Sequence, residues 1–149
     1  MILISHRGNL NGKVEEWENY PRYIDSTIDQ KFDVEIDVRY INGDLYLGHD
    51  NPDYLITLSW LRERKDKLWI HCKNHEAVEH LHQTDLNWFW HDSDDMTLTS
   101  TGFIWAHPKI QPLKNSIAVL PDNYDWDLSL CAGICSDYII KYKNNGNTI

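Results

Sequence analysis

Short apolar runs separated by polar segments recur along the whole chain. Most of these runs are a few residues long and rich in β-branched or aromatic side chains, which is typical of strands rather than helices. The runs cover residues 2–4, 34–38, 45–47, 68–70, 88–90, 103–105, 117–120 and 134–140. They predict about seven or eight short β-strands.

Helical patterns accompany the strands in the first half of the chain only. Short helices are predicted at 20–30, 57–65 and 74–83. Thr57 is a suitable N-cap for the second of them. The later connections have room for one helical turn at most, and Pro108 and Pro112 oppose even that. Strands and helices therefore alternate early in the chain, and helices are missing later.

The tripeptide Asn42-Gly43-Asp44 lies between two of the apolar runs and predicts a tight turn. Residues 34–41 and 45–48 would then form a β-hairpin. Such a hairpin brings His49 back towards the end of the first strand.

Several predicted strands end in polar residues of the kinds that carry catalysis. These ends are Ser5-His6-Arg7, Gly48-His49-Asp50, His71-Cys72-Lys73, His91-Asp92, His107-Pro108 and Ser136-Asp137. A β/α barrel places its active site at the carboxyl ends of its strands, but a complete barrel takes about 250 residues. Since this chain has 149 residues, we expect an α/β fold in the form of a reduced, TIM-like β/α barrel. It would have about seven or eight short strands and lack helices in its second half.

Length and composition indicate one domain. A content of 42% apolar residues supports a single core, which we assign to residues 1–140, with a polar tail at 141–149. The cysteines, Cys72, Cys131 and Cys135, have no zinc-like spacing and are an odd number, so buried free thiols are expected.

The charge balance restricts the partners. The 14 basic residues against 23 acidic ones give a net charge of -9, which argues against a surface that follows a nucleic acid or an anionic membrane. No apolar run approaches the length of a membrane span, and the first residues lack the apolar core of a signal peptide. We expect a cytoplasmic protein without a nucleic-acid partner or a membrane span.

Two acidic residues suggest a cation site. Glu35 and Asp37 lie two apart in a predicted strand, so both carboxylates project from the same face. An exposed strand face is the alternative interpretation. If that face lines a barrel interior, however, the carboxylates need a partner, and a divalent metal suits them.

The order of three motifs is more specific than any one of them. His6-Arg7-Gly8, Glu35-x-Asp37 and Gly48-His49-Asp50 follow one another at the ends of successive predicted strands. This set resembles the glycerophosphodiester phosphodiesterase family, within the phosphatidylinositol phospholipase C-like phosphodiesterase superfamily. The resemblance extends to Lys73 and to Gly133-x-x-Ser136-Asp137 near the end of the chain.

The resemblance implies a metal-dependent hydrolase that acts on glycerophosphodiesters or similar small phosphodiesters. The roles it implies are acid and base for His6 and His49, metal ligands for Glu35 and Asp37, and phosphate contacts for Arg7 and Lys73. The chemistry is consistent with these roles, because histidine titrates near neutral pH and can move a proton in either direction. Lipid, glycerophosphodiester and nucleotide-like esters all remain open as substrates.

One position departs from the family. A third acidic ligand generally lies two residues before the lysine, where this chain has His71. If His71 coordinates the metal, Mn²⁺ or Zn²⁺ suits the site better than Ca²⁺. Without it, two carboxylates and water suit Mg²⁺. We expect one divalent metal, with Mg²⁺ first and Mn²⁺, Ca²⁺ or Zn²⁺ as alternatives.

Other interpretations stay open. The chain could be a catalytically impaired remnant of the same barrel that only binds phosphate. It could also be a zinc hydrolase that uses His71, His91 and His107, although no HxH or HExxH spacing supports this. A homodimer would cover the flank that the missing helices leave open.

Overall fold

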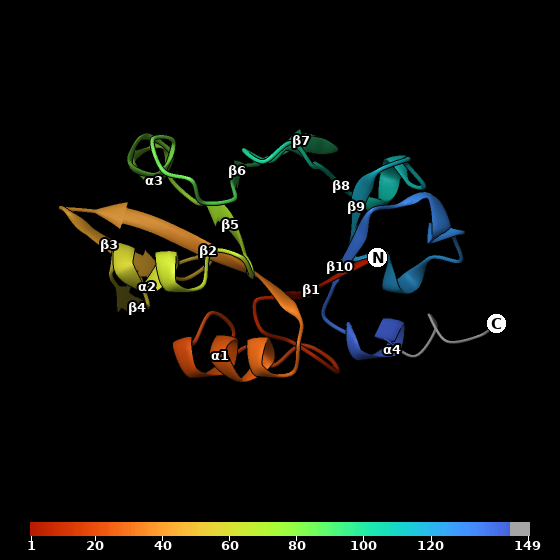
Figure 1. Ribbon diagram of the computed structural model, residues 1–149, viewed down its shortest axis with the longest axis horizontal. Helices are drawn as coiled ribbons and strands as arrows, with labels where there is room; N and C mark the ends of the chain where they lie inside the picture. The colour runs from red at the N-terminus through yellow and green to blue at the C-terminus, as the bar shows by residue number, and fades with distance from the viewer. Residues whose placement is uncertain (144–149) are drawn as a thin grey trace.

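The computed structural model describes residues 1–143, and its main feature is a mixed sheet of ten strands that curls into a half-barrel (Figure 1). The strands are β1 (Ile2–His6), β2 (Asp33–Ile41), β3 (Asp44–Leu47), β4 (Tyr54–Ile56), β5 (Leu68–Cys72), β6 (Trp88–Trp90), β7 (Met96–Leu98), β8 (Ile104–Ala106), β9 (Ser116–Val119) and β10 (Gly133–Ser136). The described residues also form four short helices, α1 (Pro21–Asp29), α2 (Leu58–Glu63), α3 (His75–Leu81) and α4 (Ile140–Lys143).

Seven strands run parallel, and most of the polar residues lie at their ends. Across the sheet they follow the order β6, β5, β2, β1, β10, β9, β8, so the first strand pairs with both the second and the last. β3 and β4 extend β2 as an antiparallel hairpin and its continuation, and β7 pairs antiparallel with β8. The carboxyl ends of the parallel strands therefore meet at one edge of the curl.

The expected TIM-like barrel with about seven or eight strands is wrong. The sheet is mixed and has ten strands, and α-helices stand between strands only up to β6. β4 was not predicted, and β7 lies in a segment that we expected to be a loop. Each has three residues, too few for a hydrophobic period to show. The predicted run 134–140 divides into β10, a turn and the start of α4.

Several local predictions are confirmed. The hairpin of β2 and β3 turns at Asn42 and Gly43, whose φ angles of 51° and 88° are those that a type I′ turn requires. Thr57 caps α2, because its hydroxyl accepts a hydrogen bond of 3.0 Å from the Trp60 amide. Helices α1, α2 and α3 lie within the three predicted segments.

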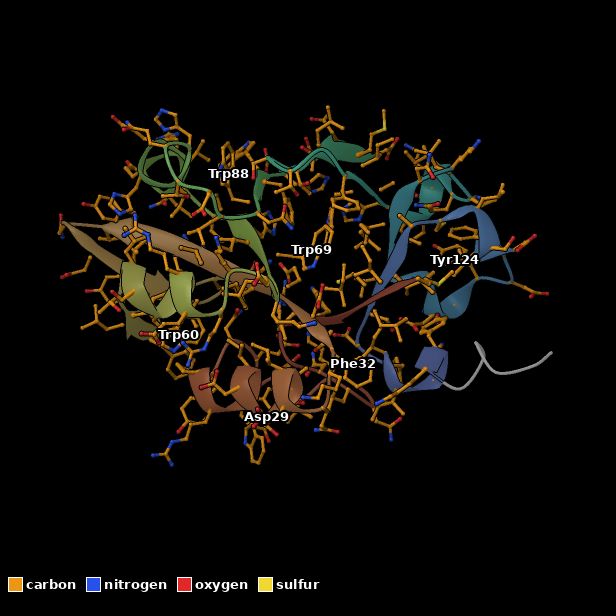
Figure 2. The ribbon with its side chains drawn as sticks, viewed as in Figure 1. Asp29, Phe32, Trp60, Trp69, Trp88 and Tyr124 are labelled. Carbon is orange, nitrogen blue, oxygen red and sulfur yellow. The ribbon has the colours of Figure 1, made fainter. Side chains whose placement is uncertain are left out.

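Alternation along the strands divides the core in two. Val34, Ile36 and Val38 of β2 pack outside the curl with buried residues of α1, α2 and α3. A second cluster fills the inside of the curl, where Figure 2 shows Trp69 pointing into the space that the sheet encloses. The inner face of β2 carries Glu35 instead of an apolar residue, next to Trp69 in the register of β5.

A simple spacing links the inner core to the polar edge. In five parallel strands a buried apolar residue of the inner cluster is followed two positions later by a histidine or an aspartate. The pairs are Ile4 and His6, Trp69 and His71, Phe89 and His91, Trp105 and His107, and Cys135 and Asp137. Because residues two apart share one face of a strand, the polar side chains stand above an apolar floor.

The chain end and the cysteines complete the description. Residues 141–143 of the predicted tail belong to α4, whereas 144–149 lie outside the described residues. Cys72, Cys131 and Cys135 are buried thiols. None of the helices within residues 1–143 has the length and hydrophobicity needed to cross a bilayer.

Candidate active site

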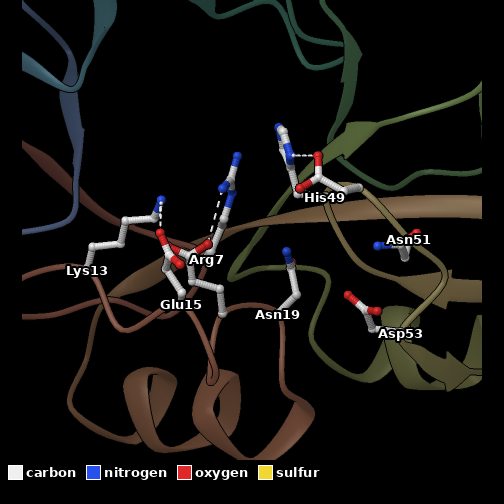
Figure 3. Close-up of a pocket in the computed structure, with 9 residues that line it drawn as sticks. Arg7, Lys13, Glu15, Asn19, His49, Asn51 and Asp53 are labelled. Atoms are coloured by element: carbon white, nitrogen blue, oxygen red, sulfur yellow. Dashed lines mark hydrogen bonds and ion pairs between the residues drawn. The ribbon is translucent and has the colours of Figure 1, made fainter.

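A cleft of about 280 Å³ opens at the carboxyl edge of the parallel strands. Its walls include His6, Arg7, Glu35, His49, His71 and Lys73. The structure thus brings together all the predicted site residues, with Asp37 fully buried beside them. A second hollow of about 410 Å³ adjoins the cleft, since Arg7 and His49 line both. Figure 3 shows the side chains of Arg7 and His49 extending in the same direction from the wall of this hollow.

Glu35, Asp37 and His71 form the acidic centre of the cleft. One ligand atom from each lies within 4.8 Å of the other two. Glu35 Oε2 and Asp37 Oδ1 are buried and accept no hydrogen bond from the described residues. Such unpaired anionic oxygens are costly in a buried site and are what a metal cation satisfies. The group therefore fits a divalent metal.

The ring of His71 is oriented by its neighbours. Its Nε2 lies 3.0 Å from the carbonyl oxygen of His91, so this nitrogen donates a hydrogen bond there. Nδ1 faces the carboxylates, at 3.4 Å from Asp37 Oδ1 and 3.7 Å from Glu35 Oε1. Donation from one ring nitrogen to a carbonyl is the usual support of a histidine that ligates metal through the other.

Without a cation, protonated His71 balances the carboxylates. Burial alone would lower the pKa of His71, but the adjacent carboxylates of Asp37 and Glu35 favour the protonated ring and raise the pKa to about 9. Burial would conversely raise the pKa of Asp37, but His71 and Arg7 hold it well below its usual range. The centre thus keeps both aspartate and imidazole charged near neutral pH.

Arg7 occupies a sharp turn directly after β1. It has a left-handed φ of 56°, and Gly8 follows at 95°. The Arg7 Nε lies 2.9 Å from Asp37 Oδ2, and its Nη1 lies 3.1 Å from Glu18 Oε2. A Cβ at Gly8 would come within 2.6 Å of the Tyr23 ring, so packing against Tyr23 requires this glycine.

His6 ends β1 and bonds to the strand beside it. Its Nδ1 lies 2.8 Å from Asp137 Oδ1, just beyond β10, and its Nε2 lies 3.8 Å from Glu35 Oε2. Burial would lower the pKa of His6, but the hydrogen bond to Asp137 and the charge of Glu35 outweigh it and raise the pKa. Asp137 fixes the ring so that Nε2 faces the cleft, as an orienting carboxylate does for a histidine that moves protons.

His49 reaches the cleft from the loop after β3. It is more exposed than His6, and its Nδ1 lies 2.7 Å from Asp50 Oδ1. Gly48 before it has a φ of 147°, and a Cβ there would meet the Asn51 carbonyl oxygen at 1.8 Å. Arg39 donates hydrogen bonds to the carbonyl oxygens of Gly48 and His49. The loop is thus fixed at the position that delivers His49.

Lys73 directly follows β5 and lines the cleft. Its amide donates to the Val38 carbonyl oxygen over 2.9 Å, which holds the backbone in place. Within residues 1–143 its ammonium group forms no ion pair. An unpaired cation in a cleft is available to an anionic ligand.

His91 and His107 stand at the same edge but do not form a metal site with His71. Their rings stack on each other at 4.4 Å, whereas the His71 and His91 rings are 6.3 Å apart. Among the described residues only Glu35, Asp37 and His71 meet as potential ligands. The geometry gives the three-histidine zinc site no support.

Supporting residues of the site carried little signal in the sequence. Asp137 belonged to a recognised motif, but its contact with His6 depends on the pairing of the first and last strands. Asn19 is buried and holds Asp37 twice, since its amide donates to Oδ2 and its Oδ1 accepts from the Asp37 amide, each over 2.9 Å. Glu18 holds Arg7. Both precede α1 in a segment without hydrophobic periodicity, so no pattern marked them.

No family model matches the chain, and no curated protein or solved structure shows significant similarity to it. The case for a function therefore depends on the residues and geometry of the cleft.

Proposed function

We propose that this protein is a metal-dependent phosphodiester hydrolase that acts on small phosphodiesters such as glycerophosphodiesters. The observation that carries the proposal is the convergence of two histidines, two cations and a buried carboxylate group on one cleft. The similarity of the motifs to those of glycerophosphodiester phosphodiesterases agrees with this assignment.

Each side chain has a role that follows from its position. Arg7 and Lys73 contact the phosphoryl oxygens and balance their charge. His6 and His49 are partners in proton transfer, one to the leaving oxygen and one from the nucleophile. Asp137 Oδ1 lies 2.8 Å from His6 Nδ1, and this contact keeps the His6 ring turned towards the cleft.

Glu35, Asp37 and His71 would hold the metal. A divalent cation bound there supplies positive charge against the phosphoryl oxygens. A ligand set of two carboxylates and one imidazole suits Mn²⁺ better than Ca²⁺, because Ca²⁺ takes oxygen ligands. Mg²⁺ and Zn²⁺ are the ions with which Mn²⁺ should be compared first.

The test is hydrolysis by metal-stripped protein. Bis(p-nitrophenyl) phosphate and glycerophosphocholine are incubated with the protein and added Mg²⁺, Mn²⁺, Ca²⁺ or Zn²⁺. We expect turnover that needs a cation and is fastest with Mn²⁺. The His6→Ala variant should lose a factor of about 10² to 10⁴ in kcat, the usual contribution of a proton-transfer residue.

The same experiment can reject the hydrolase. Unchanged turnover in His6→Ala would remove His6 from the chemistry. Absence of turnover with every cation, in a protein that still binds inorganic phosphate in the cleft, would instead favour a phosphate-binding protein.

A further inference from the structure

A buried asparagine joins two carboxylates that support the cleft. Asn9 follows the sharp turn after β1 and is fully buried. Its amide nitrogen donates a hydrogen bond of 3.0 Å to Glu18 Oε1 and another of 2.8 Å to Asp137 Oδ1. A side-chain amide has two hydrogens to donate, so these two carboxylates use both of them.

Each of the two carboxylates holds a different side chain of the cleft. Glu18 accepts from Asn9 at Oε1, and its Oε2 lies 3.1 Å from Arg7 Nη1. Asp137 Oδ1 lies 2.8 Å from the Asn9 amide nitrogen and also 2.8 Å from His6 Nδ1. Asn9 is therefore separated by a single carboxylate from the Arg7 guanidinium and from the His6 ring.

The other polar atoms of Asn9 fix the direction of its amide. The Oδ1 atom accepts a hydrogen bond of 3.1 Å from the Val14 amide and one of 3.4 Å from the Tyr23 hydroxyl. The backbone amide of Asn9 donates to the His6 carbonyl oxygen over 3.0 Å. Its carbonyl oxygen accepts from the Ser5 hydroxyl over 2.7 Å. With these atoms engaged, the nitrogen of the side chain faces the two carboxylates.

A neutral amide also suits the charge at this position. Burial would raise the pKa of Asp137, but hydrogen bonds from His6 and Asn9 help to hold it below its usual value. An aspartate in place of Asn9 would set a third anion against two carboxylates. Once protonated, it would still have only one hydrogen to donate. An isosteric acid therefore cannot hold both carboxylates.

We propose that Asn9 is a positioning residue that fixes Arg7 and His6 relative to each other through the two carboxylates. This inference rests on the proposed function, because it takes Arg7 as a phosphate contact and His6 as a partner in proton transfer. Asn9 is fully buried and therefore does not touch the substrate. A change at Asn9 should disturb phosphate binding and the orientation of His6 together.

The Asn9→Asp variant of the full chain tests this without requiring turnover. It keeps the oxygen that accepts from Val14 but loses the donor to at least one carboxylate. We expect its Kd for inorganic phosphate, measured by titration calorimetry, to rise about three- to tenfold, the equivalent of about one net hydrogen bond. The Nδ1 proton of His6, identified in ¹⁵N-histidine NMR spectra by its absence from His6→Ala, should exchange with water about tenfold faster.

Thr99→Val is the matched control for the loss of a buried polar contact. The Thr99 hydroxyl is buried and accepts from the Phe103 amide over 3.1 Å, just before β8 begins. The urea midpoint of this variant should fall, while its phosphate Kd and the exchange of the His6 proton stay at wild-type values. If Asn9→Asp does not fold, Asn9→Ser replaces it, because the shorter side chain is neutral and has one hydrogen to donate.

Each result bears on the inference. Wild-type phosphate affinity or wild-type proton exchange in a folded Asn9 variant would overturn it, and so would the same two changes in Thr99→Val. Wild-type protein that binds no phosphate would overturn it as well, since Arg7 would then not be a phosphate contact.

Hydrolysis of bis(p-nitrophenyl) phosphate is measured separately. In an active hydrolase, Asn9→Asp should lower kcat about 10- to 100-fold and raise KM, because both His6 and Arg7 are misplaced. If wild-type protein shows no turnover but the changes in Kd and proton exchange appear, the role of Asn9 stands and the hydrolase is rejected.

Discussion

Single residues decide how the acidic centre is neutralised. Where a third carboxylate would add negative charge, His71 adds a group that is positive without a cation and neutral when it ligates one. Arg7 supplies a permanent positive charge against Asp37 at 2.9 Å. The centre can thus remain folded without metal, which two or three buried carboxylates alone could not achieve at low cost.

Replacing Glu35 by glutamine tests the centre at this scale. The Glu35→Gln variant removes one anionic ligand while it keeps the shape of the side chain, so we expect Mn²⁺ affinity to fall about 10- to 100-fold. Glu18→Gln is the matched control, because Glu18 binds Arg7 and lies outside the ligand group. Calorimetric titration of metal-stripped protein measures both. Equal Mn²⁺ affinity in wild type and Glu35→Gln would exclude this centre as the metal site.

At the scale of secondary-structure elements, the turns that follow strands position the side chains of the site more than the helices do. The loop after β3 carries His49, and its shape depends on Gly48, where a Cβ would overlap the Asn51 carbonyl oxygen. The β2–β3 turn contains Gly43, also at positive φ, but a Cβ there has no neighbour within 4 Å. Substitution of Gly43 would therefore introduce backbone strain alone, whereas substitution of Gly48 would add steric overlap.

The comparison of Gly48→Ala with Gly43→Ala uses this difference. Gly43→Ala should cost about 1 kcal/mol of unfolding free energy, through strain alone, and leave hydrolysis unchanged. Gly48→Ala should cost about 3 kcal/mol and reduce kcat/KM at least about tenfold, because the loop must move and His49 moves with it. Urea unfolding and steady-state kinetics provide the two readouts. Similar activity in both variants would show that the position of His49 does not depend on this loop geometry.

Elements with a distinct local pattern could be predicted from the sequence, and the others could not. The Asn42-Gly43 turn and the Thr57 cap each depend on a few adjacent residues, so the sequence predicted both. The polar residues at the predicted strand ends were the residues that line the cleft. β4 and β7 are too short to show a period. The barrel expectation failed because parallel strands suggest flanking helices, whereas the antiparallel additions β3, β4 and β7 complete this sheet.

At the scale of the whole molecule, the acidic centre couples stability to pH. The His71 pKa of about 9 lies above the ordinary value of 6.5, so the folded state binds this proton more tightly than the unfolded state. A raised pKa stabilises the fold fully below pH 6.5, and the contribution is lost as the pH rises through about 9. The folding stability of the metal-free protein should therefore decrease as the pH rises across this range.

Urea unfolding in the presence of chelator measures the effect. We expect the unfolding free energy to fall by about 2 kcal/mol between the two pH values, after allowance for partial solvent access. His71→Gln should flatten the dependence, while His75→Gln should keep it, because the side chain of His75 is 90% exposed. A dependence that persists unchanged in His71→Gln would assign it to another group.

The pairing of β1 with β10 has a consequence for synthesis. His6 and Asp137 are separated by 131 positions along the chain, yet they share one hydrogen bond. During translation, the first strand leaves the ribosome long before its partner exists, and its other edge can pair only with β2. Nascent chains that stop short of β10 should thus have an unoriented His6, and β8 and β9 would lack the strand that joins them to β1. The cleft should therefore take its final form only after β10 has been synthesised and has paired with β1.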